Sequence, residues 1–381
     1  MNLDISLDQR EQHAPINLVG RMLQKLHIDG MLLVLLMLIC ATGLFVLYSA
    51  DGQSFGRVNR QLIRMLVAFG GAIVIAQMSP NLLRMWAPFL FIAGLILLVL
   101  VEFTGNIGKG AQRWLDVGLF TFQPSEIMKL AVPMAVAWYL HKKSLPPNFK
   151  TLGVCALIIV APAYLILRQP DLGTALLIAS SGILAIFFAG LSKRLILGLG
   201  MLAAAAAPAV WHFDLIRDYQ KQRILTMFNP ESDPLGAGYH IIQSKIAIGS
   251  GGLFGKGWLN GTQSQLEFLP ERSTDFIFAV LGEEFGLMGL LTLLLLYLLI
   301  AARGMVIANH AQDTFSRLLA GSISGTFFVY VFVNTGMVTG LLPVVGVPLP
   351  LVSYGGTSMV TIMAGFGILM SIHSHRKFMA K

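Results

Sequence analysis

Three ionisable side chains stand where the sequence passes from polar to strongly apolar residues. Asp275 is the last charge before a long apolar run, and Glu126 and Lys129 lie three residues apart at the beginning of another. A carboxylate at such a boundary can take a proton from a hydroxyl group, and a lysine can stabilise charge that develops on a leaving group. Each also has a plainer interpretation: an acid in the first helical turn, capped by Thr274 or Ser273, stabilises the helix, and an ion pair only neutralises two charges.

Other charged residues near these three differ in what they can do. Glu283 and Glu284 follow Asp275 within the same apolar run, roughly 12 to 14 Å further along a helix. We therefore interpret them as structural or gating charges. Residues 108–126 precede the Glu126 pair and supply Arg113 for an anionic ligand and Trp114 as an interfacial aromatic residue. The presence of Arg113 and Trp114 in the preceding segment favours a functional interpretation of Glu126 and Lys129.

Two segments of a long polar stretch carry weaker signals. Residues 249–261 contain six glycines and Lys256, a composition that resembles a phosphate-binding loop because glycine lets backbone N–H groups approach an anion. The strand, turn and helix context of a nucleotide loop is missing, so glycine content alone favours a flexible or re-entrant turn. Residues 217–228 have basic and apolar residues at helical spacing, which suits either a membrane-surface helix or an ordinary loop helix.

The composition sets the fold class. Of the 381 residues, 55% are hydrophobic and 12% are charged, against roughly 25% charged residues in soluble domains. We predict an all-α integral membrane protein with about ten transmembrane helices, because the apolar runs are continuous rather than alternating as in β-barrels. The expected spans are residues 31–48, 62–78, 86–103, 127–140, 152–167, 174–188, 195–211, 276–301, 318–341 and 351–372.

Basic residues in the short connections predict the orientation, since they concentrate on the cytoplasmic side. Both termini are then cytoplasmic, and one large extracytoplasmic loop, residues 213–275, joins the seventh and eighth helices. Residues 1–30 form an N-terminal segment in which an interfacial helix over 17–27 and a disordered tail are both open. Residues 31–375 form a single transmembrane domain, and 376–381 form a cytoplasmic tail. The net charge of +8 suits anionic lipid and does not indicate nucleic acid.

Five motifs in a fixed order give the chain a resemblance to the SEDS family, and to its rod-shape branch more than to its division branch. The resemblance covers the chain from about residue 29 onward. Its motifs are GAQRWLDVG (110–118), FQPSEIMK (122–129), RQPDLGTA (168–175), the loop run ending in LPERSTDFIF (229–278) and PVVGVPLPLVSYGG (343–356).

The resemblance implies a peptidoglycan glycosyltransferase that polymerises lipid II at the outer face of the inner membrane. It also implies two kinds of partner, a class B penicillin-binding protein that cross-links the product and other membrane proteins of the elongation complex. Asp275 matches the essential aspartate of the family, Glu126 and Lys129 match its acidic and basic pair, and Arg113 matches its outer-loop arginine. Asp171 lies in the family's Gln-Pro-Asp-Leu-Gly segment.

These residue types suit the implied reaction. Asp275 would act as general base towards the attacking sugar hydroxyl, and Arg113, Lys129 and Lys256 are the cations available for the departing diphosphate. Glu126 would hold Lys129 in place. Since an α-linked donor gives a β-linked glycan by one inversion, a single carboxylate suffices. A divalent cation, magnesium or manganese, is a further source of positive charge, although the sequence shows no metal-binding motif.

Two other residues have supporting roles in this hypothesis. Asp171, at the outer end of the sixth span, is interpreted as a helix cap or support rather than a catalytic group. Ser353 begins the tenth span in a segment expected to line a lipid groove. Two rival functions are a lipid II flippase, which should place its polar groups near the membrane midplane, and a scaffold that recruits the cross-linking enzyme.

Overall fold

The computed structural model describes residues 26–108, 111–116, 118, 121–213, 217–234 and 236–375. The predicted interfacial helix near the N-terminus lies largely outside these residues, and the tail 376–381 lies wholly outside them. The described residues form ten helices of 17 residues or more: α3 (Gly30–Ala50), α4 (Phe55–Ala76), α5 (Pro80–Thr104), α6 (Pro124–Leu140), α7 (Phe149–Arg168), α8 (Leu172–Phe188), α9 (Lys193–His212), α13 (Ile277–Asn309), α14 (Thr314–Thr339) and α15 (Thr357–Ser374).

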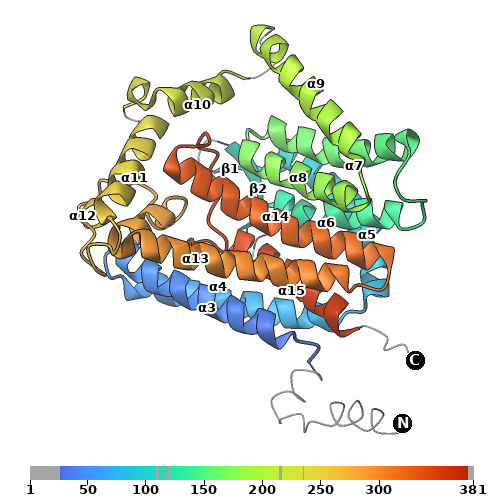
Figure 1. Cartoon of the computed structure of the whole chain (residues 1–381), viewed down its shortest axis with the longest axis horizontal. Coiled ribbons are helices and arrows are strands. Elements are labelled where there is room, and N and C mark those ends of the chain that lie inside the picture. Colours follow the sequence, from blue (N-terminus) through green and yellow to red (C-terminus); the bar gives the residue numbers. More distant parts are fainter. Residues whose placement is uncertain are drawn as a thin grey trace, which may run out of the picture.

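Most of these helices run side by side along one direction (Figure 1). In the described part of the chain, seven of them are long and apolar enough to cross a membrane. The helical membrane fold expected from the apolar runs is therefore confirmed. Several boundaries differ from the expected spans: α4 and α5 begin seven and six residues earlier, and α13 continues eight residues further, to Asn309. The last helix begins at Thr357 rather than at Leu351, after a turn rich in proline and glycine.

The all-α prediction is also wrong in one detail. Between α5 and α6 the chain forms three short antiparallel strands, β1 (Asn106–Gly108), β2 (Ala111–Asp116) and β3 (Thr121–Phe122), in the order β1-β2-β3. This segment contains several glycines, and Gly118 has a φ of +86°, a conformation that glycine adopts without strain. The strands place the Arg113 and Trp114 side chains on a paired backbone rather than on a loose loop.

The predicted large connection contains several short helices. These are α10 (Asp218–Phe228), the 3₁₀-helix η2 (Pro230–Ser232), α11 (Ala237–Gly251) and α12 (Thr262–Gln265). They gather at one end of the molecule, whereas α3 begins and α15 ends at the other (Figure 1). Residues 217–228 thus form the helix expected from their spacing, while its contact with a membrane surface stays a prediction.

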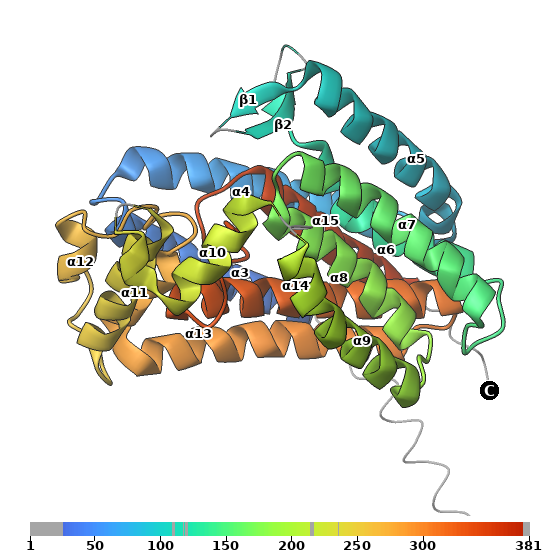
Figure 2. The ribbon, with the colours of Figure 1, turned by 90° about the horizontal axis from the view of Figure 1, so that it is seen from above.

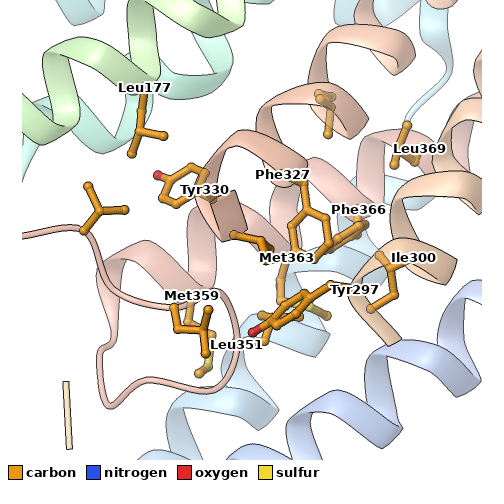
Figure 3. Close-up of a cluster of buried hydrophobic side chains, with 14 of the residues drawn as sticks. Leu177, Tyr297, Ile300, Phe327, Tyr330, Leu351, Met359, Met363, Phe366 and Leu369 are labelled. Carbon is orange, nitrogen blue, oxygen red and sulfur yellow. The ribbon is translucent and has the colours of Figure 1, made fainter. Parts of the chain in front are cut away.

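Aromatic and small residues pack the centre of the bundle. Tyr297, Phe327 and Phe366 form a buried cluster, with ring centroids 5.7 Å apart for the first pair and 5.0 Å for the second (Figure 3). Elsewhere the helix backbones approach closely at glycine: a Cβ atom on Gly367 of α15 would lie 2.5 Å from the carbonyl oxygen of Ala72 in α4. Small residues at such crossings are typical of membrane helix packing.

A buried aspartate ties three helices together at the end where α3 begins. Asp29 is the N-cap of α3 and accepts a hydrogen bond from the Leu32 amide at 2.8 Å. Its carboxylate also pairs with Arg303 of α13 and lies 3.3 Å from Nε2 of His373 in α15. Burial alone would raise the pKa of Asp29, but the Arg303 side chain, the Leu32 amide and the His373 charge outweigh it and hold this pKa below its usual range.

We expect Asp29→Asn to destabilise the protein by about 1.5 to 3 kcal/mol, the usual contribution of hydrogen bonds to a charged group. Asparagine keeps the helix cap but cannot replace the ionic bond to Arg303. Thermal unfolding in detergent measures the change. Asp313→Asn is a matched control, since Asp313 caps α14 through the Ser316 amide, and an equal loss in both variants would refute the ionic role.

Candidate active site

Asp275 lies just before α13 rather than in its first turn. The N-cap position is Phe276, whose ring cannot accept a backbone hydrogen bond, and the helix begins at Ile277. The expected caps and the first-turn acid are therefore wrong. The reason is a turn that starts at Glu271, where the Thr274 amide donates to the Glu271 carbonyl at 3.0 Å and the Thr274 hydroxyl donates to its carboxylate at 2.6 Å.

The backbone on the N-terminal side of α13 is held at three consecutive carbonyl groups, residues 273–275. The Tyr354 amide donates to the first at 2.8 Å, and the Ser353 hydroxyl donates to the second at 2.5 Å. The Nδ2 of Asn334 in α14 donates to the third at 2.9 Å and to the carbonyl of Val347 at 2.7 Å. Asn334 is completely buried, so the position of Asp275 is set by packed neighbours.

The turn formed by residues 345–347 contacts both Asp275 and the first turn of α8. Gly346 has a φ of +72°, and a Cβ atom there would lie 3.6 Å from Oδ2 of Asp275. The same turn covers Gly173, where a Cβ atom would lie 2.7 Å from the carbonyl oxygen of Val345. The half-buried Asp275 side chain and the N-terminal turn of α8 therefore both adjoin residues 345–347.

Asp171 caps α8, as predicted, and also meets Arg113. Its Oδ1 accepts a hydrogen bond from the Thr174 amide at 3.2 Å, and its Oδ2 accepts one from Gln123 at 3.1 Å. Nη1 of Arg113 lies 3.6 Å from the same Oδ2, and Nε of Arg113 donates to the Gln169 carbonyl at 3.1 Å. Arg113 is thereby fixed in direction while its side chain stays 29% exposed.

Arg223 of α10 is a further cation that interacts with the charges of Arg113 and Asp171. Burial lowers the pKa of Arg223 and the charge of Arg113 lowers it further, whereas Tyr219 and Asp171 act in the opposite direction. These influences place Arg223 within electrostatic reach of Arg113 and Asp171. The sequence identified only a basic amphipathic segment here, and its helical period could have indicated an inward-facing arginine but not the contact.

Glu126 and Lys129 form a buried ion pair on one face of α6, as their spacing predicted. Their oxygen and nitrogen atoms are 2.7 Å apart, and the residues are 8% and 7% exposed. The ammonium group also lies over the Tyr330 ring at 5.3 Å. Tyr330 and Asn334 are one turn apart on α14, about 6 Å along the axis, so this helix contacts both the ion pair and the backbone of Asp275.

A large cavity opens beside Glu126. It has a volume of about 860 Å³ and is lined by residues that include Arg64, Trp114, Gln123, Glu126 and Gly356. A second cavity of about 280 Å³ continues along α6 and is lined mainly by apolar side chains. Figure 2 shows α5 and the strands β1 and β2 standing apart from α4 and α15 around this region. The lining combines polar groups at one end with an apolar path at the other.

Arg64 of α4 lines this cavity, and Arg60 lies one helical turn earlier. The guanidinium group of Arg64 lies over the Tyr354 ring at 4.6 Å. Burial alone would raise the pKa of Tyr354, but hydrogen bonding to Arg60 and the charges of Arg64 and Arg60 outweigh it and lower this pKa. No sequence motif identified these two arginines as site residues, although their spacing of four residues puts them on one helical face. Their approach to Tyr354, almost 300 residues later, has no local signal.

Lys256 and Ser353 do not line the large cavity beside Glu126. Nζ of Lys256 is 2.7 Å from the buried Glu283 carboxylate and 2.8 Å from the Thr262 hydroxyl. Lys256 is thus the ion-pair partner of Glu283, and the choice between a structural and a gating role for Glu283 stays a prediction. Ser353 is 4% exposed and its hydroxyl also accepts a hydrogen bond from the Leu349 amide at 2.8 Å, so it supports the backbone near Asp275 and does not line the large cavity.

Comparison with known proteins places the chain in a family. Residues 29–378 match the family model FtsW/RodA/SpoVE, described as cell cycle protein. The chain is 55% identical to peptidoglycan glycosyltransferase MrdB of Escherichia coli K12, over 94% of this chain and 96% of that protein. It is 40% identical to a probable peptidoglycan glycosyltransferase FtsW of Trichlorobacter lovleyi, over 92% and 94% of the two chains.

Solved structures agree with this result. A structure entitled "Structural coordination of polymerization and crosslinking by a peptidoglycan synthase complex" superimposes with a TM-score of 0.80 at 32% identity, covering 92% of this chain and 99% of that chain. The rod shape determining protein RodA of Thermus thermophilus gives a TM-score of 0.69 at 30% identity, with 92% and 98% coverage. The chain therefore belongs to the FtsW/RodA/SpoVE family of multi-pass membrane proteins, the SEDS family that its motifs resemble.

Proposed function

We propose that the protein is a peptidoglycan glycosyltransferase that joins lipid II disaccharide units into β-1,4 glycan strands, releases undecaprenyl diphosphate and serves wall elongation. The observation that carries this proposal is the position of the half-buried Asp275 carboxylate, whose backbone is fixed by Asn334. Residues 345–347 adjoin both this carboxylate and the first turn of α8, the helix that is capped by Asp171, the partner of Arg113. The identity to MrdB, which is named for this activity, supports the choice of reaction.

In the proposed reaction a sugar hydroxyl of one lipid II molecule attacks the anomeric carbon of another. Its oxygen forms the new glycosidic bond, its proton passes to Asp275, and the bond from the anomeric carbon to the diphosphate oxygen breaks with its electrons on the diphosphate. Arg113 and Arg223 would stabilise that charge on one side, and Lys129, oriented by Glu126, would do so on the other. The configuration inverts once, so no covalent sugar intermediate is needed.

We further propose that the cavity beside Glu126 holds the polyprenyl diphosphate of one substrate. Its arginine and glutamine end suits a diphosphate, and its apolar continuation along α6 suits an isoprenoid chain. A magnesium or manganese ion would enter with the diphosphate. In the part of the chain that the structure describes, three acidic, imidazole or thiol groups do not gather at one point, so the ion would take most ligands from substrate and water.

We propose that ten helices cross the inner membrane, that both termini are cytoplasmic and that Asp275 faces the periplasm. The clustering of α10, α11 and α12 at the end opposite to the start of α3 supports one large outer loop (Figure 1). We also propose a class B penicillin-binding transpeptidase and other membrane proteins of elongation as partners. The solved relative from a synthase complex that coordinates polymerization and crosslinking supports this partnership.

The test uses purified protein in liposomes with labelled lipid II, in the presence of an inhibitor of contaminating polymerases. Glycan chains longer than the disaccharide should appear, resolved by gel electrophoresis. Movement of labelled lipid across the bilayer without polymer would instead establish the flippase. If neither polymer nor movement appeared while the transpeptidase still bound, the scaffold function would replace the proposed one.

A further inference from the structure

The helix that follows Asp275 is interrupted, and another segment completes its hydrogen bonds. Gly286 has φ +63° and ψ −161°, which breaks α13 into two parts. In a continuous helix, the amides of Leu287 and Met288 would donate four residues back. Here they donate instead to the carbonyl groups of Gly252 and Leu253, at 2.9 and 3.1 Å.

The carbonyl groups left over on the other side of the break are occupied in the same way. The carbonyl of Glu283 accepts a hydrogen bond from the Lys256 amide, and that of Glu284 accepts one from the Gly257 amide, both at 3.0 Å. Residues 252–258, which we name the inserted loop, therefore satisfy the four backbone groups that the break exposes. Irregular backbone is tolerated at membrane depth only where its polar groups are satisfied in this manner.

Glycine makes this insertion sterically feasible. Gly255 has a φ of +82°, and a Cβ atom on it would lie 2.1 Å from the carbonyl oxygen of Glu284. A Cβ atom on Gly286 would lie 2.4 Å from the Gly255 nitrogen. The glycine-rich composition of residues 249–261 thus allows two backbones to pack closely. The ion pair between Lys256 and Glu283 adds a side-chain contact between the loop and α13.

Two contacts between α3 and α13 define the depth of the inserted loop. Asp29 binds Arg303 at one end, and the Ser49 hydroxyl donates to Glu284 at the other. About 20 residues separate these levels on each helix, which corresponds to roughly 30 Å, the thickness of the hydrocarbon core of a bilayer. The Glu284 level therefore marks the outer boundary of that core.

The inserted loop lies at this boundary and partly below it. It is bonded to residues 283–288, and Trp258 stacks on Phe45 of α3 with ring centroids 4.3 Å apart. Phe45 is about one helical turn, roughly 6 Å, nearer the membrane centre than Ser49. At the tip of the loop the side chains of Leu253 and Phe254 are 60% and 77% exposed. Exposed apolar side chains at this depth meet lipid rather than water.

We propose that residues 252–258 form a membrane-inserted loop whose Leu253 and Phe254 side chains contact the acyl chains of the outer leaflet. A cavity of about 620 Å³ between α3 and α13, lined by Phe45, Phe285 and Met288 among others, adjoins it and suits an acyl chain. The loop binds the backbone of α13 at residues 283–288, eight to thirteen residues after Asp275. It therefore holds Asp275 at a fixed height above the bilayer, where a lipid-linked diphosphate would lie.

The test is depth-dependent fluorescence quenching on the full-length chain in phospholipid vesicles. The buried Cys40 and Cys155 are replaced by alanine, and Phe254→Cys is labelled with nitrobenzoxadiazole. One quencher is a phospholipid with a spin label near the top of its acyl chain, and the other is aqueous iodide. Ser232→Cys in the exposed η2 segment is the water control, and Leu298→Cys, 52% exposed on α13, is the lipid control.

We expect the lipid-borne label to quench the probe at 254 several-fold more than the probe at 232, and iodide to show the reverse order. Strong iodide quenching at 254, equal to that at 232, would place the loop in water and overturn the proposal. Protection from both quenchers would also overturn it, because protein rather than lipid would then cover the tip. The readout requires no turnover, so its failure is distinct from a failure of the proposed polymerase activity.

Discussion

Asp275→Asn should abolish glycan polymerisation while the protein stays folded. Asparagine has almost the same shape, so the three carbonyl contacts of residues 273–275 are kept, but an amide cannot accept the hydroxyl proton. Loss of a general base lowers the rate by about 10² to 10⁴. The rate of polymer formation from lipid II, measured at saturating substrate, is the readout, and substrate binding should change little.

The control for this substitution is Asp313→Asn at the N-terminus of α14. Asp313 accepts hydrogen bonds from the amide and hydroxyl of Ser316, and asparagine caps a helix equally well. It lies at the opposite end of α14 from Asn334 and should leave polymerisation unchanged. If Asp275→Asn polymerised at the wild-type rate, the assignment of the base would be wrong.

The second large effect concerns the ion pair of α6. Removing one partner of a buried pair leaves an uncompensated charge and costs about 3 to 5 kcal/mol, whereas removing both is often close to neutral. We therefore expect Glu126→Gln and Lys129→Met each to lower the unfolding temperature, and the double variant to recover most of it. Polymerisation should be lost in all three if Lys129 stabilises the departing diphosphate.

This cycle separates the two interpretations of the pair. A double variant that regained both stability and activity would show that Glu126 and Lys129 only neutralise each other within the membrane. Glu284→Ala is a useful comparison, because its carboxylate binds Ser49 on α3 and not the site. Lys129→Ala should lose more activity than Glu284→Ala, and the opposite order would move the site towards the inserted loop.

The parts of the site that sequence predicted are those governed by local geometry. A spacing of three residues puts Glu126 and Lys129 on one helical face, and an aspartate three residues before Thr174 is a natural N-cap. The apolar runs identified the long helices because a spanning segment must satisfy its backbone internally. The N-cap of α13 was misplaced by two or three residues, at Thr274 or Ser273 instead of Phe276, because the turn from Glu271 competes with the expected caps.

The parts that were missed depend on contacts between distant segments. Asn334 reaches Asp275 across 59 positions, and Arg64 meets Tyr354 across nearly 300. Such pairs carry no periodic signal, since their meeting depends on how whole helices pack. The glycines around Lys256 left a phosphate-binding loop and a flexible or re-entrant turn open, with the turn favoured, because glycine permits close backbone approach to any group. Only the fold shows that this group is the backbone of α13.

The hydrogen bonds that position Asp275 have a consequence for repeated turnover. They end on carbonyl groups of residues 273–275, which do not titrate in the physiological range, and their donors are an amide side chain, a hydroxyl and a backbone N–H. In the proposed reaction the Asp275 carboxylate would take up a proton and return it to solvent, and none of these three bonds would change its charge state. The backbone contacts would thus be independent of the proposed catalytic cycle, and each new sugar would meet a carboxylate held by the same three bonds.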